Sequence, residues 1–228
     1  LLLVILSSLL AGVLSPYDPA KMELMDKLLP PAWCEGGSMA HLLGTDSLGR
    51  DVLTRCLFGA RISLAVGFAA AGINMVIGIV YGGISGYVGG KADLIMMRVV
   101  DMLYSIPNLL YIILIMLVFG SNMFSVLLGI CISSWVGMAR LVRSQVLSLK
   151  EQEFALAAYV LGASTSRILF KHLILNCIGA IIVNVTLMVP SAIFTEAFLS
   201  FVGIGISAPA SSWGTLANEA RGLIESNP

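Results

Sequence analysis

The chain has 228 residues, of which 58% are hydrophobic and 11% charged, and its formal net charge at pH 7 is zero. Soluble domains are roughly one-quarter charged, so this composition predicts a polytopic, all-α membrane protein and does not favour a nucleic-acid partner. The cysteines are scattered and form no C-x-x-C pair, and the two histidines are far apart. Neither a disulfide framework nor a metal site is therefore expected. These residues are Cys34, Cys56, Cys131, Cys177, His41 and His172.

The apolar segments predict about five spanning helices. Residues 1–14 are read as the end of a first transmembrane helix, although a signal-peptide core is an alternative. Residues 15–60 form a long polar connection, and residues 61–228 a transmembrane domain. Within that domain, further spans are expected at 62–87, 94–119, 124–139 and 178–202, with kinks at Pro107 and Pro190. Residues 203–228 are expected to form an ordered amphipathic loop rather than a domain.

The basic residues predict the orientation of the chain in the membrane. If the spans alternate, the densest group of Lys and Arg lies on the side that carries residues 140–175, which favours a cytoplasmic location for that segment. Residues 15–60 and 203–228 then lie on the extracytoplasmic side.

Polar residues inside predicted spans are costly and often functional. Asp101 follows Arg98 by three residues, so a local ion pair is the simplest expectation. Glu196 has no such partner nearby in the sequence, and it either lines a water-filled cavity or bonds a neighbouring helix. Glu196 and Asn184, which share the last predicted span, are the candidates for a translocation path.

A polar insert between residues 140 and 175 is the strongest functional signal. Ser148 and Glu151 have the spacing of a capping box, and Glu151 and Glu153 would stand in the positive first turns of a helix over 149–161. Gly162 is the expected left-handed stop, and Ser164 or Thr165 can cap the next helix. One face of the predicted helix is apolar and rich in alanine, which suits docking into a protein groove; the alternative is a helix in the lipid interface. That face consists of Phe154, Ala157, Ala158 and Leu161.

Two short patterns resemble catalytic motifs but lack necessary residues. Residues 44–51 nearly match a phosphate-binding loop, but Arg50 and Asp51 replace its lysine and hydroxyl residue, so ATP binding here is not expected. Residues 83–86 match the G-x-S-G of intramembrane serine proteases. No histidine lies within an apolar segment to activate Ser85, so a protease remains a distant alternative.

The polar insert resembles the conserved loop of ABC importer permeases, written here E-F-A-L-A-A-Y-V-L-G over residues 153–162. The rest of the chain resembles the C-type permease subunit of oligopeptide, dipeptide and nickel importers. The matching runs are L-G-T-D-S-L-G-R-D-V-L-T-R (43–55), G-A-R-I-S-L (59–64), M-R-V-V-D (97–101), S-I-P (105–107), A-R-L-V-R (139–143), E-A-F-L-S-F-V-G-I-G (196–205) and P-A-S-S-W-G (209–214).

The resemblance implies an ABC importer permease fold of six spans, of which the last is expected beyond residue 228. It implies a non-catalytic subunit that carries oligopeptides or dipeptides, with nickel as the alternative cargo. Its partners would be a homologous permease, two ABC ATPases and an extracytoplasmic binding protein. ATP and Mg²⁺ would be used by those partners, with no cofactor bound by this chain. Leu156 and Leu175 replace a glutamate and a proline that are usual in the family.

Overall fold

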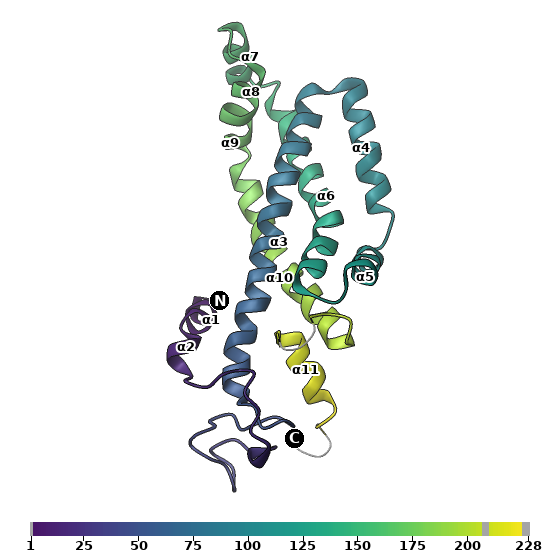
Figure 1. Cartoon of the computed structure of the whole chain (residues 1–228). Helices are drawn as coiled ribbons and strands as arrows, with labels where there is room; N and C mark the ends of the chain where they lie inside the picture. The colour runs from purple at the N-terminus through teal and green to yellow at the C-terminus, as the bar shows by residue number, and fades with distance from the viewer. Residues whose placement is uncertain (1, 207–209, 225–228) are drawn as a thin grey trace. The chain divides into compact units, whose positions relative to one another are not determined.

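The structure is a computed structural model that describes residues 2–206 and 210–224 (Figure 1). It is built from helices, and an isolated bridge between Thr45 and Asp51 is the only β-pairing in the described residues. The all-α prediction is therefore confirmed. Pro209, which begins one of the matching runs, lies outside the described residues.

The chain divides into two compact units. Unit 1 comprises Leu1–Val66, Ser121–Met123 and Ile193–Pro228, and unit 2 comprises Gly67–Gly120 and Phe124–Ala192. The helices α3 (Val52–Val88) and α10 (Ile178–Val202) contribute residues to both units.

Three described helices are long and apolar enough to cross a membrane: α3, α6 (Met123–Leu149) and α10. A fourth candidate is the broken pair α4 (Gly90–Tyr104) and α5 (Asn108–Phe119), which bend by 76°. The bend lies at Pro107, where a kink was expected. Proline disfavours a helical conformation in the residue before it, so the segment divides here into two helices. Pro190 lies inside α10, which continues through it.

Unit 2 is held together by small residues that allow close helix packing. A Cβ atom added to Gly78 would lie 2.5 Å from the Met138 side chain, and one added to Gly82 would lie 2.2 Å from the carbonyl oxygen of Ala139. Gly86 approaches the carbonyl of Arg143 in the same way. These glycines recur every four residues on α3, so one face of α3 packs against the backbone of α6.

The end of unit 2 that follows α6 carries several short helices: α7 (Glu153–Val160), α8 (Thr165–Arg167), the π-helix η2 (Ile168–Leu173) and α9 (Ile174–Asn176) (Figure 1). Beneath them is an apolar core that includes Val142, Val146, Ala155, Leu169 and Leu173. This core anchors the short helices to the end of the spanning helix α6.

Unit 1 contains α1 (Leu2–Leu9), α2 (Ala11–Leu14), the 3₁₀ helix η1 (Leu24–Asp26) and α11 (Trp213–Arg221). The 203–228 segment is therefore not only a loop, because Ser212 and Thr215 form a capping box that starts α11. Asp51 starts α3 in a similar way by accepting the backbone N–H of Thr54 at 2.7 Å.

Candidate functional site

The polar insert forms a short exposed helix, but it begins later than the sequence predicts. α6 continues to Leu149, so Ser148 is an exposed residue within α6 and cannot start the next helix. The N-cap of α7 is Gln152, whose side chain makes no capping bond. The predicted capping box of Ser148 and Glu151 is therefore wrong. Glu153 does lie in the first turn of α7, where a negative charge is favourable.

The glycine stop is confirmed. Gly162 has a φ of +76°, a conformation that is costly for residues with a side chain. Its N–H donates to the carbonyl of Tyr159 at 3.0 Å, and the N–H of Ala163 donates to the carbonyl of Ala158 at 3.0 Å. Ser164 then accepts the N–H of Arg167 at the start of α8, as expected. These bonds satisfy the carbonyls of Ala158 and Tyr159 where the chain turns at the end of α7.

Most of α7 and the turn after it expose apolar side chains. Ala155 is buried and Ala158 packs against the core of unit 2, whereas Phe154, Ala157 and Leu161 of the predicted face are exposed. The largest exposed fractions belong to Val160 at 83% and Leu161 at 86%. The face from Phe154 to Leu161 is therefore an apolar surface that the described residues leave uncovered.

A groove of about 440 Å³ lies beside α7. Its lining mixes apolar, aromatic and charged groups, which suits a protein partner with both apolar and polar contacts. The family departure Leu156 is one of the lining residues, where its side chain adds apolar surface. The lining residues are Tyr87, Lys150, Glu151, Ala155, Leu156, Tyr159 and Ile168.

Polar contacts connect the ends of the helices that precede α7. Arg143 on α6 binds Asp93 on α4 through both carboxylate oxygens, with its Nε 2.5 Å from Oδ1. Ser85 on α3 donates to the same carboxylate at 2.5 Å. Lys150 donates to the carbonyl of Gly86 at 2.9 Å. These bonds connect α3, α4 and the end of α6 directly before α7.

The predicted pair of Asp101 with Arg98 is wrong. Asp101 instead pairs with Arg140 at 2.7 Å, and the guanidinium of Arg140 also lies 4.4 Å from the ring centre of Tyr104. Sequence spacing favours a partner on the same helix, but packing of α4 beside α6 supplies another.

Glu196 is fully buried in unit 1 and accepts two hydrogen bonds. Ser63 on α3 donates to it at 3.0 Å, and Ser200 on α10 donates at 2.8 Å. Of the two alternatives that the sequence left open, this geometry favours bonding to a neighbouring helix. Asn184, the other pathway candidate, is half-buried on the part of α10 that belongs to unit 2.

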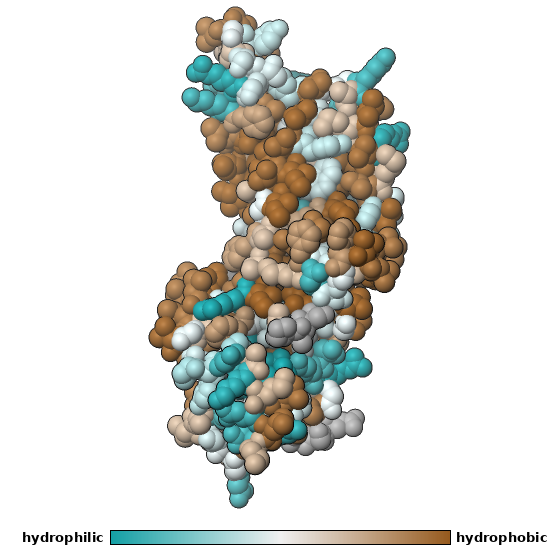
Figure 2. Space-filling view, in the orientation of Figure 1, coloured by the Kyte–Doolittle hydropathy of each residue, from teal (hydrophilic) through white to brown (hydrophobic). Residues whose placement is uncertain are grey.

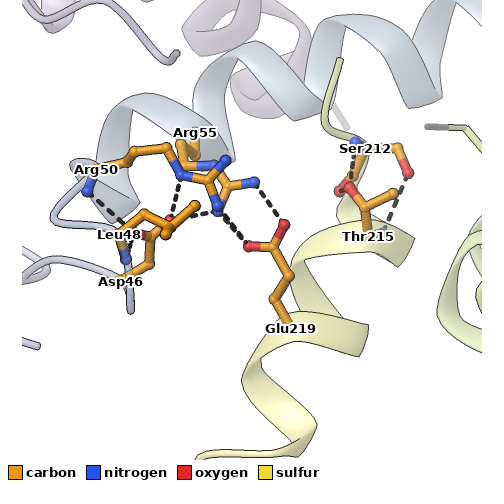
Figure 3. A network of polar contacts seen from close by, with 7 residues as sticks. All are labelled: Asp46, Leu48, Arg50, Arg55, Ser212, Thr215 and Glu219. Carbon is orange, nitrogen blue, oxygen red and sulfur yellow. Dashed lines mark hydrogen bonds and ion pairs between the residues drawn. The ribbon is translucent and has the colours of Figure 1, made fainter. Parts of the chain in front are cut away.

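A second polar network in unit 1 was not expected from the sequence. Arg55 lies between Asp46 and Glu219, and its Nη1 is 2.6 Å from Asp46 (Figure 3). Arg50 joins the same two carboxylates. Glu219 comes from α11, far along the chain from the two arginines, so no local pattern could reveal this pairing.

In both segments that resemble catalytic motifs, residues 44–51 and 83–86, the polar groups bond to other groups of this chain. Asp46 accepts the backbone N–H groups of Leu48 and Arg50, at 2.8 Å and 3.0 Å (Figure 3). The loop that resembles a phosphate-binding motif therefore directs these amides at its own carboxylate. Ser85 is buried and donates to Asp93, which is a carboxylate rather than the histidine that a serine nucleophile needs.

Comparisons with known proteins agree with this architecture. Residues 78–224 match the family described as "Binding-protein-dependent transport system inner membrane component". The chain is 48% identical to the oligopeptide transport system permease protein OppC of Bacillus subtilis, over 96% of this chain and 70% of that protein. It is also 48% identical to the dipeptide transport system permease protein DppC of Bacillus subtilis, over 98% and 68%. OppC of Escherichia coli K12 is 44% identical, over 100% and 74%.

The spanning helices and the matching family define a helical transport subunit of a membrane. The chain belongs to the family of binding-protein-dependent transport system inner membrane components. It is a permease subunit of an ABC importer and a multi-pass protein of the bacterial cytoplasmic membrane.

Proposed function

We propose that this chain forms half of a translocation pathway for oligopeptides or dipeptides, and that α7 transmits movement from a partner ATPase. The printed names of several relatives concern oligopeptide or dipeptide transport, which supports peptides as the cargo. The observation that carries the proposal is the exposed apolar surface of α7. The other side of α7 packs against the ends of α3 and α6. Rigid attachment allows a docked partner to move the spanning helices.

The partners in this proposal are a homologous permease, two cytoplasmic ABC ATPases and an extracytoplasmic peptide-binding protein. The chain itself is a non-catalytic translocator whose transport role needs no cofactor bound to it. ATP and Mg²⁺ are used by the ATPases. The bonding of Asp46 and of Ser85 to groups of this chain supports that division of labour.

Docking is proposed to rely on packing and helix geometry. Leu156 stands where the family usually has a glutamate, and it is 53% exposed beside the groove. An apolar side chain at this position cannot form an ion pair with the ATPase. It contributes buried apolar area instead, at about 25 cal/mol per Å² removed from water.

Gly162→Leu tests the coupling role. A Cβ atom at Gly162 meets nothing within 4 Å, but the positive φ imposes strain of roughly 1–2 kcal/mol on leucine. We expect ATP-driven peptide uptake to fall at least tenfold while the permease still inserts. Gly179→Leu is the matched control, because its Cβ also meets nothing within 4 Å and its φ is not positive. Normal uptake and coupled ATPase activity in Gly162→Leu would refute the role of α7.

The cargo is tested with the binding protein and the assembled importer. Peptides of two to five residues should bind the purified binding protein and compete for uptake, whereas nickel chelates should do neither. Saturable nickel binding with no peptide binding would replace the peptide assignment and leave the permease assignment intact.

Glu196 and Asn184 are proposed as pathway residues that become wet only when the importer turns over. Glu196→Cys should react slowly with a water-soluble thiol reagent at rest, because the side chain is fully buried. Reaction should accelerate during ATP hydrolysis with peptide present. A thiol at position 196 that stays unreactive in every transport state would remove Glu196 from the path.

A further inference from the structure

The polar connection of unit 1 brings together three side chains that can bind a metal ion. Glu23, Asp26 and His41 each offer one ligand atom, and these three atoms lie within 4.8 Å of one another. Glu23 directly precedes the 3₁₀ helix η1 and Asp26 is its last residue, whereas His41 lies later in the connection. The sequence alone does not reveal this cluster, because the separation of His41 from the two acids matches no metal-binding spacing.

The imidazole of His41 is held in place by a carboxylate on its far side. His41 is 6% exposed, and its Nδ1 lies 2.9 Å from Oδ1 of Asp51. An ionised carboxylate only accepts hydrogen bonds, so Nδ1 carries the hydrogen and Nε2 is left as the coordinating nitrogen. A carboxylate behind a histidine in this way is the usual support of a metal-binding imidazole.

Asp51 is itself fixed by the start of α3. Its Oδ2 accepts the backbone N–H of Thr54 at 2.7 Å and the hydroxyl of Thr54 at 2.5 Å. The ring of Tyr17 packs against His41 with ring centres 5.0 Å apart. The imidazole is therefore oriented before any ion arrives, which lowers the cost of binding.

The cluster also has an excess of negative charge. Lys21 pairs with Glu23 at 2.6 Å and offsets one of the two negative charges. In the described part of the chain, no basic side chain forms an ion pair with Asp26. Two neighbouring carboxylates repel one another unless a proton or a cation lies between them.

We propose that Glu23, Asp26 and His41 form a resident divalent metal site that binds Zn²⁺ and fastens η1 to the segment preceding α3. One imidazole nitrogen and two carboxylate oxygens suit Zn²⁺, whereas Ca²⁺ and Mg²⁺ prefer ligand sets made of oxygen. Bonds of about 2.0–2.1 Å in a tetrahedron place ligand atoms roughly 3.4 Å apart. The carboxylates must therefore close in slightly, and water completes the fourth position.

The site is independent of the cargo and of the ATPase partner. Its ligands lie in the connection before α3, and its effect is to stabilise that connection. The ion is therefore a structural component of this subunit, and peptide specificity does not depend on it.

The test uses the assembled importer, stripped with a chelator and titrated with Zn²⁺ by calorimetry, with metal content measured by mass spectrometry. We expect one Zn²⁺ per chain of this subunit. The double variant Glu23→Gln and Asp26→Asn should weaken binding at least tenfold, because the amides keep the side-chain shape and remove the charge. Hydrogen exchange across residues 20–45 should slow when Zn²⁺ binds the wild-type complex.

Two control variants separate this site from other ligands in the same connection. Glu35→Gln removes a carboxylate outside the cluster, and Cys34→Ser removes an exposed thiol. Both should bind Zn²⁺ as the wild type does. Absence of saturable binding, equal binding by the Glu23→Gln and Asp26→Asn double variant, or loss of binding in Cys34→Ser would each overturn the proposal. Preference for Ca²⁺ over Zn²⁺ would overturn the identity of the ion.

Discussion

In unit 1, charged side chains far apart in the sequence meet one another, whereas in unit 2 the segment around α7 leaves its apolar side chains exposed. Arg55 is buried between Asp46 and Glu219, while Val160 and Leu161 are more than 80% exposed. Figure 2 shows that, on the visible face, polar residues gather over the connection of unit 1, among some apolar ones, and apolar residues cover the spanning helices of unit 2. The first arrangement satisfies its own groups and stabilises a fold. The second leaves apolar surface that the described residues of this chain do not bury.

The largest expected effect is in the polar network of unit 1. Arg55→Ala removes one of the two arginines that Asp46 and Glu219 share and leaves only Arg50. Breaking a buried ion pair costs roughly 3–5 kcal/mol. We expect a clear fall in the thermal unfolding midpoint of the purified complex. Arg221→Ala is the control, since Arg221 stacks on Phe201 in the same unit at 5.8 Å without an ion pair among the described residues. Equal midpoints for the two variants would contradict a structural role for the network.

The buried carboxylate of Glu196 tests the same stabilising role of polar groups in unit 1, with a smaller expected loss of stability. Ser63→Ala removes one of its two hydroxyl donors, and an unsatisfied buried acceptor costs about 1–3 kcal/mol. Ser7→Ala serves as the control, because Ser7 donates only to a carbonyl of its own helix. The thermal midpoint should fall in Ser63→Ala and stay near the wild-type value in Ser7→Ala. The reverse order would show that Glu196 is not held by Ser63.

For α7 we expect the opposite: substitutions weaken binding of the ATPase and leave the stability of the fold unchanged. Leu156→Ala should weaken binding of the ATPase by several-fold, since an exposed leucine at an interface contributes about 1 kcal/mol. The unfolding midpoint should change little. Leu187→Ala, at an exposed position of α10, should leave ATPase binding unchanged. A large loss of stability with intact binding would make α7 part of the fold rather than a docking element.

The smallest effect concerns acid stability. Burial raises the pKa of Asp46, but the N–H groups of Arg50 and Leu48 and the Arg50 side chain outweigh it, so the pKa lies below its usual range. A lowered folded-state pKa stabilises the fold above the unfolded value of about 3.9. That contribution is lost as pH falls through the folded value. The midpoint of Asp46→Asn should therefore depend less on pH below about 4 than that of the wild type.

The sequence predicted the parts of the fold that local patterns encode. The apolar run 178–202 matches α10, and Gly162 ends α7 in a left-handed conformation as expected. Pro107 divides a predicted span into two helices that bend by 76°. The capping box predicted at Ser148 was wrong because its spacing fits a cap, whereas the helical backbone of α6 continues through Ser148.

Contacts between distant segments could not be predicted in the same way. The sequence predicts neither the ion pair of Asp101 with Arg140 nor that of Arg55 with Glu219. Both pairs depend on which helices pack together. Glu196 shows an intermediate case. The sequence identified it as a costly residue that needs a partner, and the fold supplied Ser63.

The central claim is that α7 docks on an ATPase, and site-directed cross-linking tests it most directly. Cysteines placed singly at Val160 and Leu161 should form cross-links with the ATPase subunit in the assembled importer, because these side chains are 83% and 86% exposed. A cysteine at Val183, which is 63% exposed on α10, should form none. Cross-links from position 183 and none from 160 or 161 would contradict the account.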